Sequence, residues 1–301
     1  MHVILTGATG LVGSAVLDAM IKTKDITKIS ILSRRPVHMA DDAKDPRINV
    51  ILQSDFEKYD SEVLKQLQGA KGCVWALGIS QSKVDADQYV KITKDYAIEA
   101  AKAFATLSTS EAEPFRFVYV SGSGATQEPG RFSPIFARIK GETETALADL
   151  TIEKPTLRVY SPRPAFVDAQ NHKSILPYIP NPGALINGTM FLIGPPMRML
   201  MKSMHSPTPM LGDFLAQLAM GKLDGRLEGT PGSRYFKGRK GDIPDAKLNG
   251  LLKGEERQGF GEPRSTGTGI RDEGEIADTD TTYRRLCRAP SDDKLVAGRY
   301  P

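Results

Sequence analysis

An apolar segment at the start of the chain runs directly into three glycines whose spacing suits the binding of phosphate groups. Residues 2–5 read as a short strand, Gly7, Gly10 and Gly13 follow, and apolar residues then recur at helical spacing. Gly7 allows a tight turn, Gly10 lets the backbone approach a pyrophosphate, and Gly13 lets the helix pack closely on the strand. The pattern predicts a dinucleotide site at the helix N-terminus. Its predicted contacts are Gly7, Thr9, Gly10, Leu11, Val12 and Gly13.

The end of the second predicted strand indicates which dinucleotide is bound. An NAD site usually has an acidic residue there, which accepts hydrogen bonds from the adenosine ribose. This chain has Ser33, Arg34 and Arg35 instead. A guanidinium binds a ribose 2′-phosphate through two parallel hydrogen bonds, so these residues favour NADP over NAD. The alternative is a pair of exposed arginines in a surface loop.

Two further positions follow predicted strands. Asp55 comes just after the third strand and suits a contact to the adenine amino group; it could equally cap a helix that begins near Phe56. Gly78 is expected to end the fourth strand, where the missing side chain lets the backbone pass close to the cofactor ribose.

These residues need a scaffold in which strands and helices alternate. Short β-prone segments are expected at 28–32, 48–52, 72–77, 115–120 and 156–160, and helices at 61–68, 87–107 and 134–150. This alternation predicts an α/β fold with a doubly wound parallel sheet, the Rossmann arrangement. Ligands of such sheets bind beyond the carboxyl ends of the strands.

The composition is that of an ordinary globular domain. The chain has 301 residues, of which 40% are hydrophobic and 25% are charged. A net charge of +4 gives no reason to expect a nucleic-acid partner, and two cysteines fit a reducing compartment. The first apolar segment lacks the basic leader and cleavage site of a signal peptide, so we expect a cytoplasmic protein. No His, Cys or carboxylate cluster has the spacing of metal ligands.

The chain changes character near its end. Residues 225–301 hold 13 of the 28 glycines and lack long periodic apolar segments, so we expect a disordered tail. Residues 1–224 form the predicted NAD(P)-binding domain, with a small substrate segment at about 166–224. Residues 183–201 are rich in methionine but are interrupted by glycines and prolines, which leaves peripheral membrane contact open and predicts no membrane span.

The fifth strand and the following helix carry further polar side chains. The strand leads into Ser121 and Ser123, and Ser133 followed by Pro134 suits the N-cap and first position of a helix. Phe136 and Lys140 then lie one turn apart on one face of that helix. Together with the glycine turn, these residues resemble the short-chain dehydrogenase/reductase superfamily, and most closely its atypical, epimerase-like branch in fungi. The resemblance covers about residues 1–222.

The resemblance implies roles for several residues. In that superfamily a serine polarises the substrate carbonyl, a tyrosine transfers the proton, and a lysine four residues on holds the ribose. Ser121 and Lys140 match the serine and the lysine, and Ser123 is a further candidate for proton relay. The tyrosine position holds Phe136, which has no ionisable proton. Pro164 lies where the family's backbone borders the nicotinamide; Arg163 beside it suits either an acidic substrate group or an ion pair within the fold.

The missing tyrosine leaves several functions open. The chain could be an NADP-dependent oxidoreductase that uses Ser121, Ser123 or water to relay the proton to a small carbonyl or enone-like substrate. It could instead bind NADPH as a regulatory or redox-sensing module, or catalyse a reaction that needs no hydroxyl protonation. A protein-interaction scaffold is a further alternative. The partner is expected to be a small molecule, and a homo-oligomer remains open.

Overall fold

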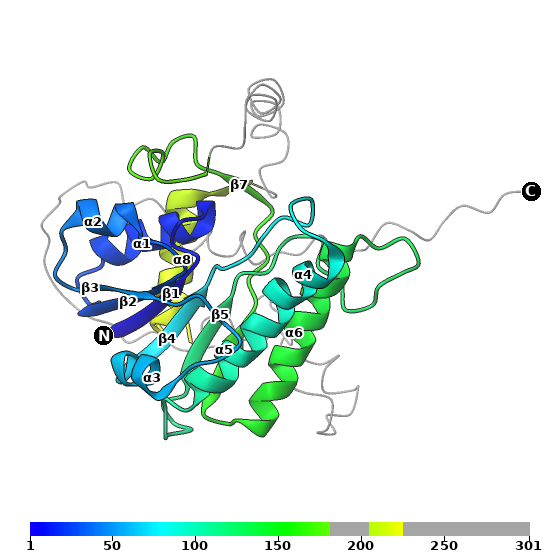
Figure 1. The fold of residues 1–301 in the computed structure, drawn as a ribbon, viewed down its shortest axis with the longest axis horizontal. Helices are drawn as coiled ribbons and strands as arrows, with labels where there is room; N and C mark the ends of the chain where they lie inside the picture. The colour runs from blue at the N-terminus through cyan, green and yellow to red at the C-terminus, as the bar shows by residue number, and fades with distance from the viewer. Residues whose placement is uncertain (181–204, 225–301) are drawn as a thin grey trace, which may run out of the picture.

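The computed structural model describes residues 1–180 and 205–224, and the core of this part is a six-stranded parallel sheet (Figure 1). The strand order is β3-β2-β1-β4-β5-β6: successive strands are added on one side of β1 up to β3, and then on its other side from β4 onward. This is the predicted doubly wound arrangement, and it opens a crevice between the carboxyl ends of β1 and β4. The strands are β1 (His2–Thr6), β2 (Lys28–Ser33), β3 (Ile48–Leu52), β4 (Ala70–Trp75), β5 (Phe115–Tyr119) and β6 (Leu157–Tyr160).

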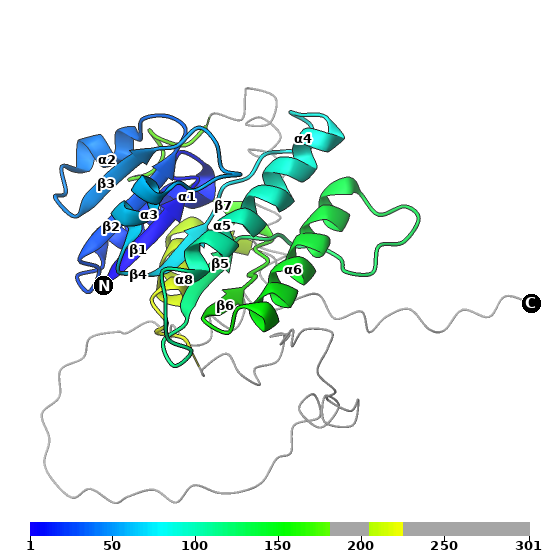
Figure 2. The same ribbon diagram turned by 60° about the horizontal axis from the view of Figure 1, so that its bottom comes forward.

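Helices cover both faces of the sheet, as Figures 1 and 2 show from two directions. One buried cluster joins the sheet to α1 (Leu11–Lys22), α2 (His38–Ala43) and α8 (Thr208–Ala219). A second joins the opposite face to α3 (Ser61–Leu67), α5 (Tyr96–Ala105) and α6 (Ile135–Glu153). Burial of these two apolar layers is the main term that stabilises the fold.

The segment after the main sheet returns to the first helix. β7 (Phe166–Asp168) and β8 (His205–Pro207) form a separate two-stranded parallel sheet, and α8 then crosses α1. At the crossing, a Cβ atom on Gly212 would lie 2.3 Å from the carbonyl oxygen of Ala15. The two backbones therefore touch, and a glycine is required for the contact.

Several predicted boundaries were wrong. β4 ends at Trp75, so Gly78 lies in the loop beyond the strand and does not end it. The helix expected at 87–107 is divided into α4 (Ala86–Val90), a π-helical segment η1 (Lys91–Asp95) and α5. Such segments insert an extra residue into a helical turn and are frequent at functional sites, but have no simple sequence signature.

The start of α6 also differs from the prediction. The N-cap is Pro134, and the helix begins at Ile135. Ser133 does not cap it, because its hydroxyl accepts a hydrogen bond from the backbone N–H of Gly130 at 2.9 Å. The serine thus closes the preceding loop.

The expected tail at 225–301 and the whole methionine-rich segment at 183–201 lie outside the described residues, so the domain boundary at 224 stays a prediction. Within residues 1–180 and 205–224, no helix has the length and apolar character needed to cross a bilayer.

Candidate functional site

The glycine turn after β1 is too tightly packed for side chains at two of its positions. Gly7 has a φ of 72°, and a Cβ atom there would lie 2.3 Å from the carbonyl oxygen of Ala76. At Gly13 a Cβ atom would lie 2.0 Å from the carbonyl oxygen of Gly7. The turn thus brings the end of β1, the loop after β4 and the start of α1 into backbone contact. This is the geometry that the spacing predicts.

The start of α1 has the donors that a pyrophosphate needs. Gly10 is the N-cap, and no side chain of the described residues caps the helix there. The first helical hydrogen bond runs from the N–H of Ser14 to the carbonyl of Gly10, at 2.9 Å. The amides of Leu11, Val12 and Gly13 precede it and have no acceptor within the helix. These amides and the positive end of the helix dipole suit a pyrophosphate.

The guanidinium of Arg35 lies beside this turn. Its Nη2 donates to Thr9 Oγ1 at 3.1 Å, which links the end of β2 to the glycine turn. Ser33 fixes the backbone of Arg35, because its Oγ donates to the Arg35 carbonyl at 2.7 Å and accepts from the Arg35 N–H at 3.3 Å. Arg34 is exposed. The structure therefore places a cation, and no carboxylate, at the end of β2.

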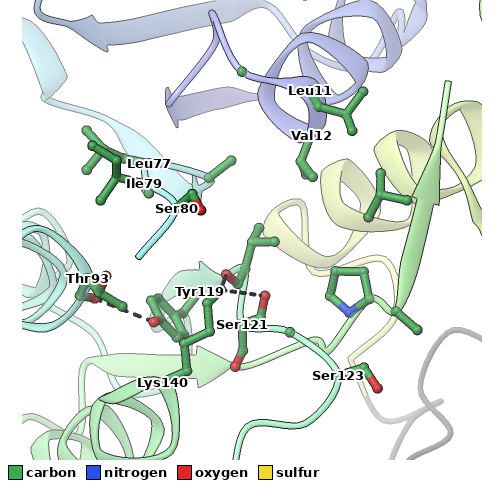
Figure 3. A pocket seen from close by; sticks show the side chains of 18 residues that line it. Leu11, Val12, Leu77, Ile79, Ser80, Thr93, Tyr119, Ser121, Ser123 and Lys140 are labelled. Carbon is green, nitrogen blue, oxygen red and sulfur yellow. Dashed lines mark hydrogen bonds between the residues drawn. The ribbon is translucent and has the colours of Figure 1, made fainter. Parts of the chain in front are cut away.

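A cavity of about 440 Å³ opens next to the turn, at the carboxyl ends of β1, β4 and β5 (Figure 3). Eight predicted site residues line it: Gly10, Leu11, Val12, Gly78, Ser121, Ser123, Lys140 and Pro164. Other predicted residues are not part of its lining: Gly7, Thr9, Gly13, Ser33, Arg34, Arg35 and Asp55. Thr93 of η1 also lines the cavity, as does the loop after β4 with Leu77, Ile79 and Ser80 (Figure 3).

Asp55 has a local structural contact in an exposed turn. Its Oδ1 accepts a hydrogen bond from the backbone N–H of Glu57 at 2.8 Å. The alternative prediction, a helix cap near Phe56, was wrong. The helix begins at Ser61, and Asp60 caps it by accepting from the N–H of Val63 at 2.8 Å.

Lys140 reaches from α6 to the floor of the cavity. Its Nζ donates to the carbonyl oxygen of Ser121 at 2.8 Å and to that of Val120 at 3.3 Å. It also lies 6.0 Å from the centre of the Tyr119 ring. Burial lowers the pKa of the Lys140 ammonium to about 8, and the negative charge of Glu144 opposes this shift. Lys140 is therefore a cation at neutral pH, although burial makes its ammonium group easier to deprotonate.

Ser121 is held by the same helix through its side chain. Its Oγ donates to Glu144 Oε1 at 2.5 Å, and Glu144 is only 1% exposed. Arg163 pairs with both oxygens of this carboxylate, through Nε to Oε1 at 2.9 Å and through Nη2 to Oε2. Of the two predictions for Arg163, the structure shows the ion pair within the fold.

Sequence reasoning missed Glu144. Its signal was its position one turn after Lys140 on α6, the spacing at which two side chains share a helix face. A carboxylate on the face that presents Lys140 to the strand ends can reach the same serine.

Two aromatic side chains, Phe136 and Tyr119, lie near the floor of the cavity. A Cβ atom on Gly124 would lie 3.6 Å from Phe136 Cζ, so the phenyl ring covers the loop after β5. Tyr119 is buried, and its hydroxyl donates to the carbonyl oxygen of Thr93 at 3.4 Å. Burial raises the pKa of Tyr119, so this phenol is not an effective acid at neutral pH. Tyr160 is only partly buried, and its hydroxyl donates to Asp224.

The sequence matches the NAD(P)H-binding family over residues 7–161, just over half of the chain. The protein belongs to this family. The match includes the glycine turn, Arg35, Ser121 and Lys140, which are the residues that build the site from β1 to α6.

Three similar proteins come from fungi. Botcinic acid biosynthesis cluster B protein 16 of Botryotinia fuckeliana is 47% identical over 133 residues, which cover 44% of this chain and 84% of that protein. Leucinostatins biosynthesis cluster protein T of Purpureocillium lilacinum is 36% identical over 198 residues, covering 60% of this chain and 70% of that protein. Protein fmp52, mitochondrial, of Emericella nidulans is a further relative, 29% identical over 58% of this chain and 70% of its own length.

Solved structures share the fold. The PhqB reductase domain from Penicillium fellutanum has a TM-score of 0.55 at 13% identity, over 73% of this chain and 64% of that chain. The short-chain dehydrogenase/reductase YIR035C from Saccharomyces cerevisiae has a TM-score of 0.51 at 14% identity, over 73% of this chain and 90% of that chain. These likenesses confirm the predicted fold.

Proposed function

We propose that the protein is an NADP-dependent oxidoreductase of the atypical short-chain type, which acts on a small carbonyl or enone-like metabolite of fungal secondary metabolism. The observation that carries the nucleotide preference is the position of Arg35, whose guanidinium is tied to Thr9 of the glycine turn. A 2′-phosphate on the adenosine ribose would meet this cation and the neighbouring Arg34. The two relatives named after biosynthesis clusters support the metabolic setting.

The residues around the cavity suit a nicotinamide cofactor. The amides at the start of α1 would hold its pyrophosphate, and Lys140 would hold the nicotinamide ribose. When bound, the cofactor supplies or takes a hydride; the protein supplies position and charge. Apolar side chains of Val12, Leu77 and Ile79 line the same cavity, as is usual in cofactor sites.

The nucleotide preference is tested by fluorescence titration with NADPH and NADH. We expect tighter binding of NADPH, and we expect Arg35→Ala to weaken it by about 10- to 100-fold while NADH affinity is unchanged, because charge-assisted hydrogen bonds contribute about 1.5–3 kcal/mol. Arg34→Ala is the parallel variant, and Arg138→Ala, an exposed arginine of α6, is the control. Equal affinities of the unaltered protein for the two nucleotides would refute NADP specificity.

Phe136 favours a second candidate, a non-catalytic NADPH-binding regulatory or redox-sensing protein. NADPH affinity without NADPH consumption over a panel of carbonyl and enone compounds would support it. Consumption that Lys140→Met abolishes would support the oxidoreductase.

The proposed location of the protein is the cytoplasm, whereas the fmp52 relatives are named mitochondrial. Imaging of a fluorescent fusion distinguishes the two compartments.

A further inference from the structure

The Ser121 hydroxyl is already committed as a donor. A hydroxyl group has one hydrogen and two lone pairs. At Ser121 the hydrogen is directed at Glu144 Oε1, 2.5 Å away and buried behind the cavity floor. The oxygen of Ser121 therefore has only lone pairs left for a ligand.

The carboxylate that takes this hydrogen is fixed in place. Arg163 contacts both of its oxygens, and Gln127 Nε2 donates to Oε2 at 3.4 Å. A guanidinium that faces both oxygens of a carboxyl group is the arrangement of an anion, which accepts hydrogen bonds and donates none. Rotation of the Ser121 hydroxyl toward the cavity would remove one of the two hydrogen bonds that the buried Glu144 Oε1 accepts and leave it with Arg163 alone, which is unfavourable.

The backbone of Ser121 is held from the other side. Lys140 donates to its carbonyl oxygen at 2.8 Å, and Lys140 and Glu144 lie one turn apart on α6. Lys140, labelled with Ser121 in Figure 3, thus holds the main chain of this cavity-lining residue, and Glu144 on the same helix face holds its hydroxyl.

We propose that the Glu144–Arg163 pair sets the specificity of the pocket by keeping Ser121 a hydrogen-bond acceptor, so that Ser121 binds the hydroxyl group of an alcohol and not the oxygen of a carbonyl. The inference rests on the proposed oxidoreductase function: of the carbonyl substrate and the alcohol formed from it, Ser121 holds the alcohol. Of the alcohol and the carbonyl compound that the enzyme interconverts, the alcohol donates to Ser121, whereas the carbonyl has no hydrogen to donate. Glu144 is a positioning residue in this scheme, since it acts through Ser121.

Two unreactive complexes test the proposal by calorimetry. Cyclohexanol is titrated into the NADPH-bound protein and cyclohexanone into the NADP⁺-bound protein, because neither pair can exchange a hydride. In Glu144→Gln the amide N–H can donate to Ser121 and release the hydroxyl hydrogen toward the cavity. We expect the ratio of alcohol to ketone affinity to fall by about tenfold or more in this variant, as expected when one hydrogen bond changes direction.

Glu142→Gln is the matched control. Glu142 lies on the same helix, is partly exposed and pairs with Lys94 at 3.1 Å, so the affinity ratio should not change. If Glu144→Gln does not fold, Ser121→Ala takes its place: it should weaken cyclohexanol about tenfold and leave cyclohexanone unchanged.

Three results would overturn the inference: an unchanged ratio in Glu144→Gln, equal losses for both probes in Ser121→Ala, or no binding of either probe by a protein that binds NADPH. A protein that binds no NADP(H) at all would refute the proposed function itself, which keeps the two failures distinct.

Discussion

The glycine turn after β1 and the loop after β5 lie at the same cavity, but they are built by different means. The turn depends on backbone atoms in contact, such as the Gly7 and Gly13 positions where a Cβ atom has no room. The loop after β5 depends on side chains that pair over long separations in the sequence, namely Ser121, Glu144 and Arg163. The first region tolerates almost no change in shape, whereas the second depends on charges that must stay matched.

The largest effect is expected at the turn. Gly7→Ala would place a methyl group 2.3 Å from the carbonyl oxygen of Ala76, at a φ that L-residues avoid. The turn must open, and the Kd for NADPH should rise by about 100-fold or more, equivalent to about 2.7 kcal/mol. Fluorescence titration measures the affinity, and thermal unfolding measures the loss of stability.

Gly69→Ala provides the control for Gly7→Ala. Gly69 has a φ of 78°, but a Cβ atom there would have no neighbour within 4 Å. The variant should lose about 1–2 kcal/mol of stability from backbone strain alone and keep its NADPH affinity. Equal NADPH affinity of the two variants would show that the close contact at Gly7 is not required.

The next effect concerns the ion pair behind the second region. Arg163→Met leaves the buried carboxylate of Glu144 without its cation, and removal of one partner from such a pair costs about 3–5 kcal/mol. Denaturant unfolding measures the change, with the exposed Arg138→Met on α6 as the control. If Arg163→Met and Arg138→Met are equally stable, the pair does not stabilise the loop after β5.

A smaller effect is expected from pH. Burial lowers the pKa of Lys140 to about 8, whereas an unfolded lysine keeps its ordinary value of 10.5. Between these values the unfolded chain holds a proton that the folded protein has lost. The contribution of Lys140 to the free energy of unfolding therefore rises with pH in this window, by at most about 1.4 kcal/mol per pH unit.

Comparison with Lys140→Met isolates this contribution. The difference in stability between the unaltered protein and Lys140→Met should change between pH 8 and pH 10.5. The exposed Lys102→Met gives the baseline, since Lys102 pairs with Glu99 on the surface. Parallel pH profiles for all three proteins would contradict a lowered pKa at Lys140.

The same contrast explains how far the sequence predicts the molecule. The turn could be predicted because Gly7, Gly10 and Gly13 each meet a local requirement of the backbone, which the sequence shows directly. The position of Arg35 beside Thr9 followed from the order of the strands. Glu144 has only a weak local signal, its place one turn after Lys140, because its role comes from Ser121 and Arg163, which reach it only after β5, α6 and β6 have assembled.

Other errors have equally physical causes. The helix α8 was not predicted because it lies in a segment whose prolines, methionines and glycines mask its apolar periodicity. The π-helical segment η1 has the composition of an ordinary helix, so the sequence shows one continuous pattern where the backbone changes its hydrogen bonding. Asp55 and Ser133 were assigned helix caps, but the N-cap of α3 is Asp60, further along the chain, and that of α6 is Pro134, the next residue.

The backbone contact between Gly212 of α8 and Ala15 of α1 has a mechanical consequence. A late part of the chain therefore packs directly on the helix whose first amides face the cavity. His172 links the same two helices, because its ring nitrogens form hydrogen bonds of 3.0 Å with Asp18 of α1 and with Thr208 of α8. The two helices must therefore open and close as one cooperative unit. We expect a ligand bound at the first amides of α1 to slow amide exchange near residue 212, although the two stretches are separated by most of the domain's sequence.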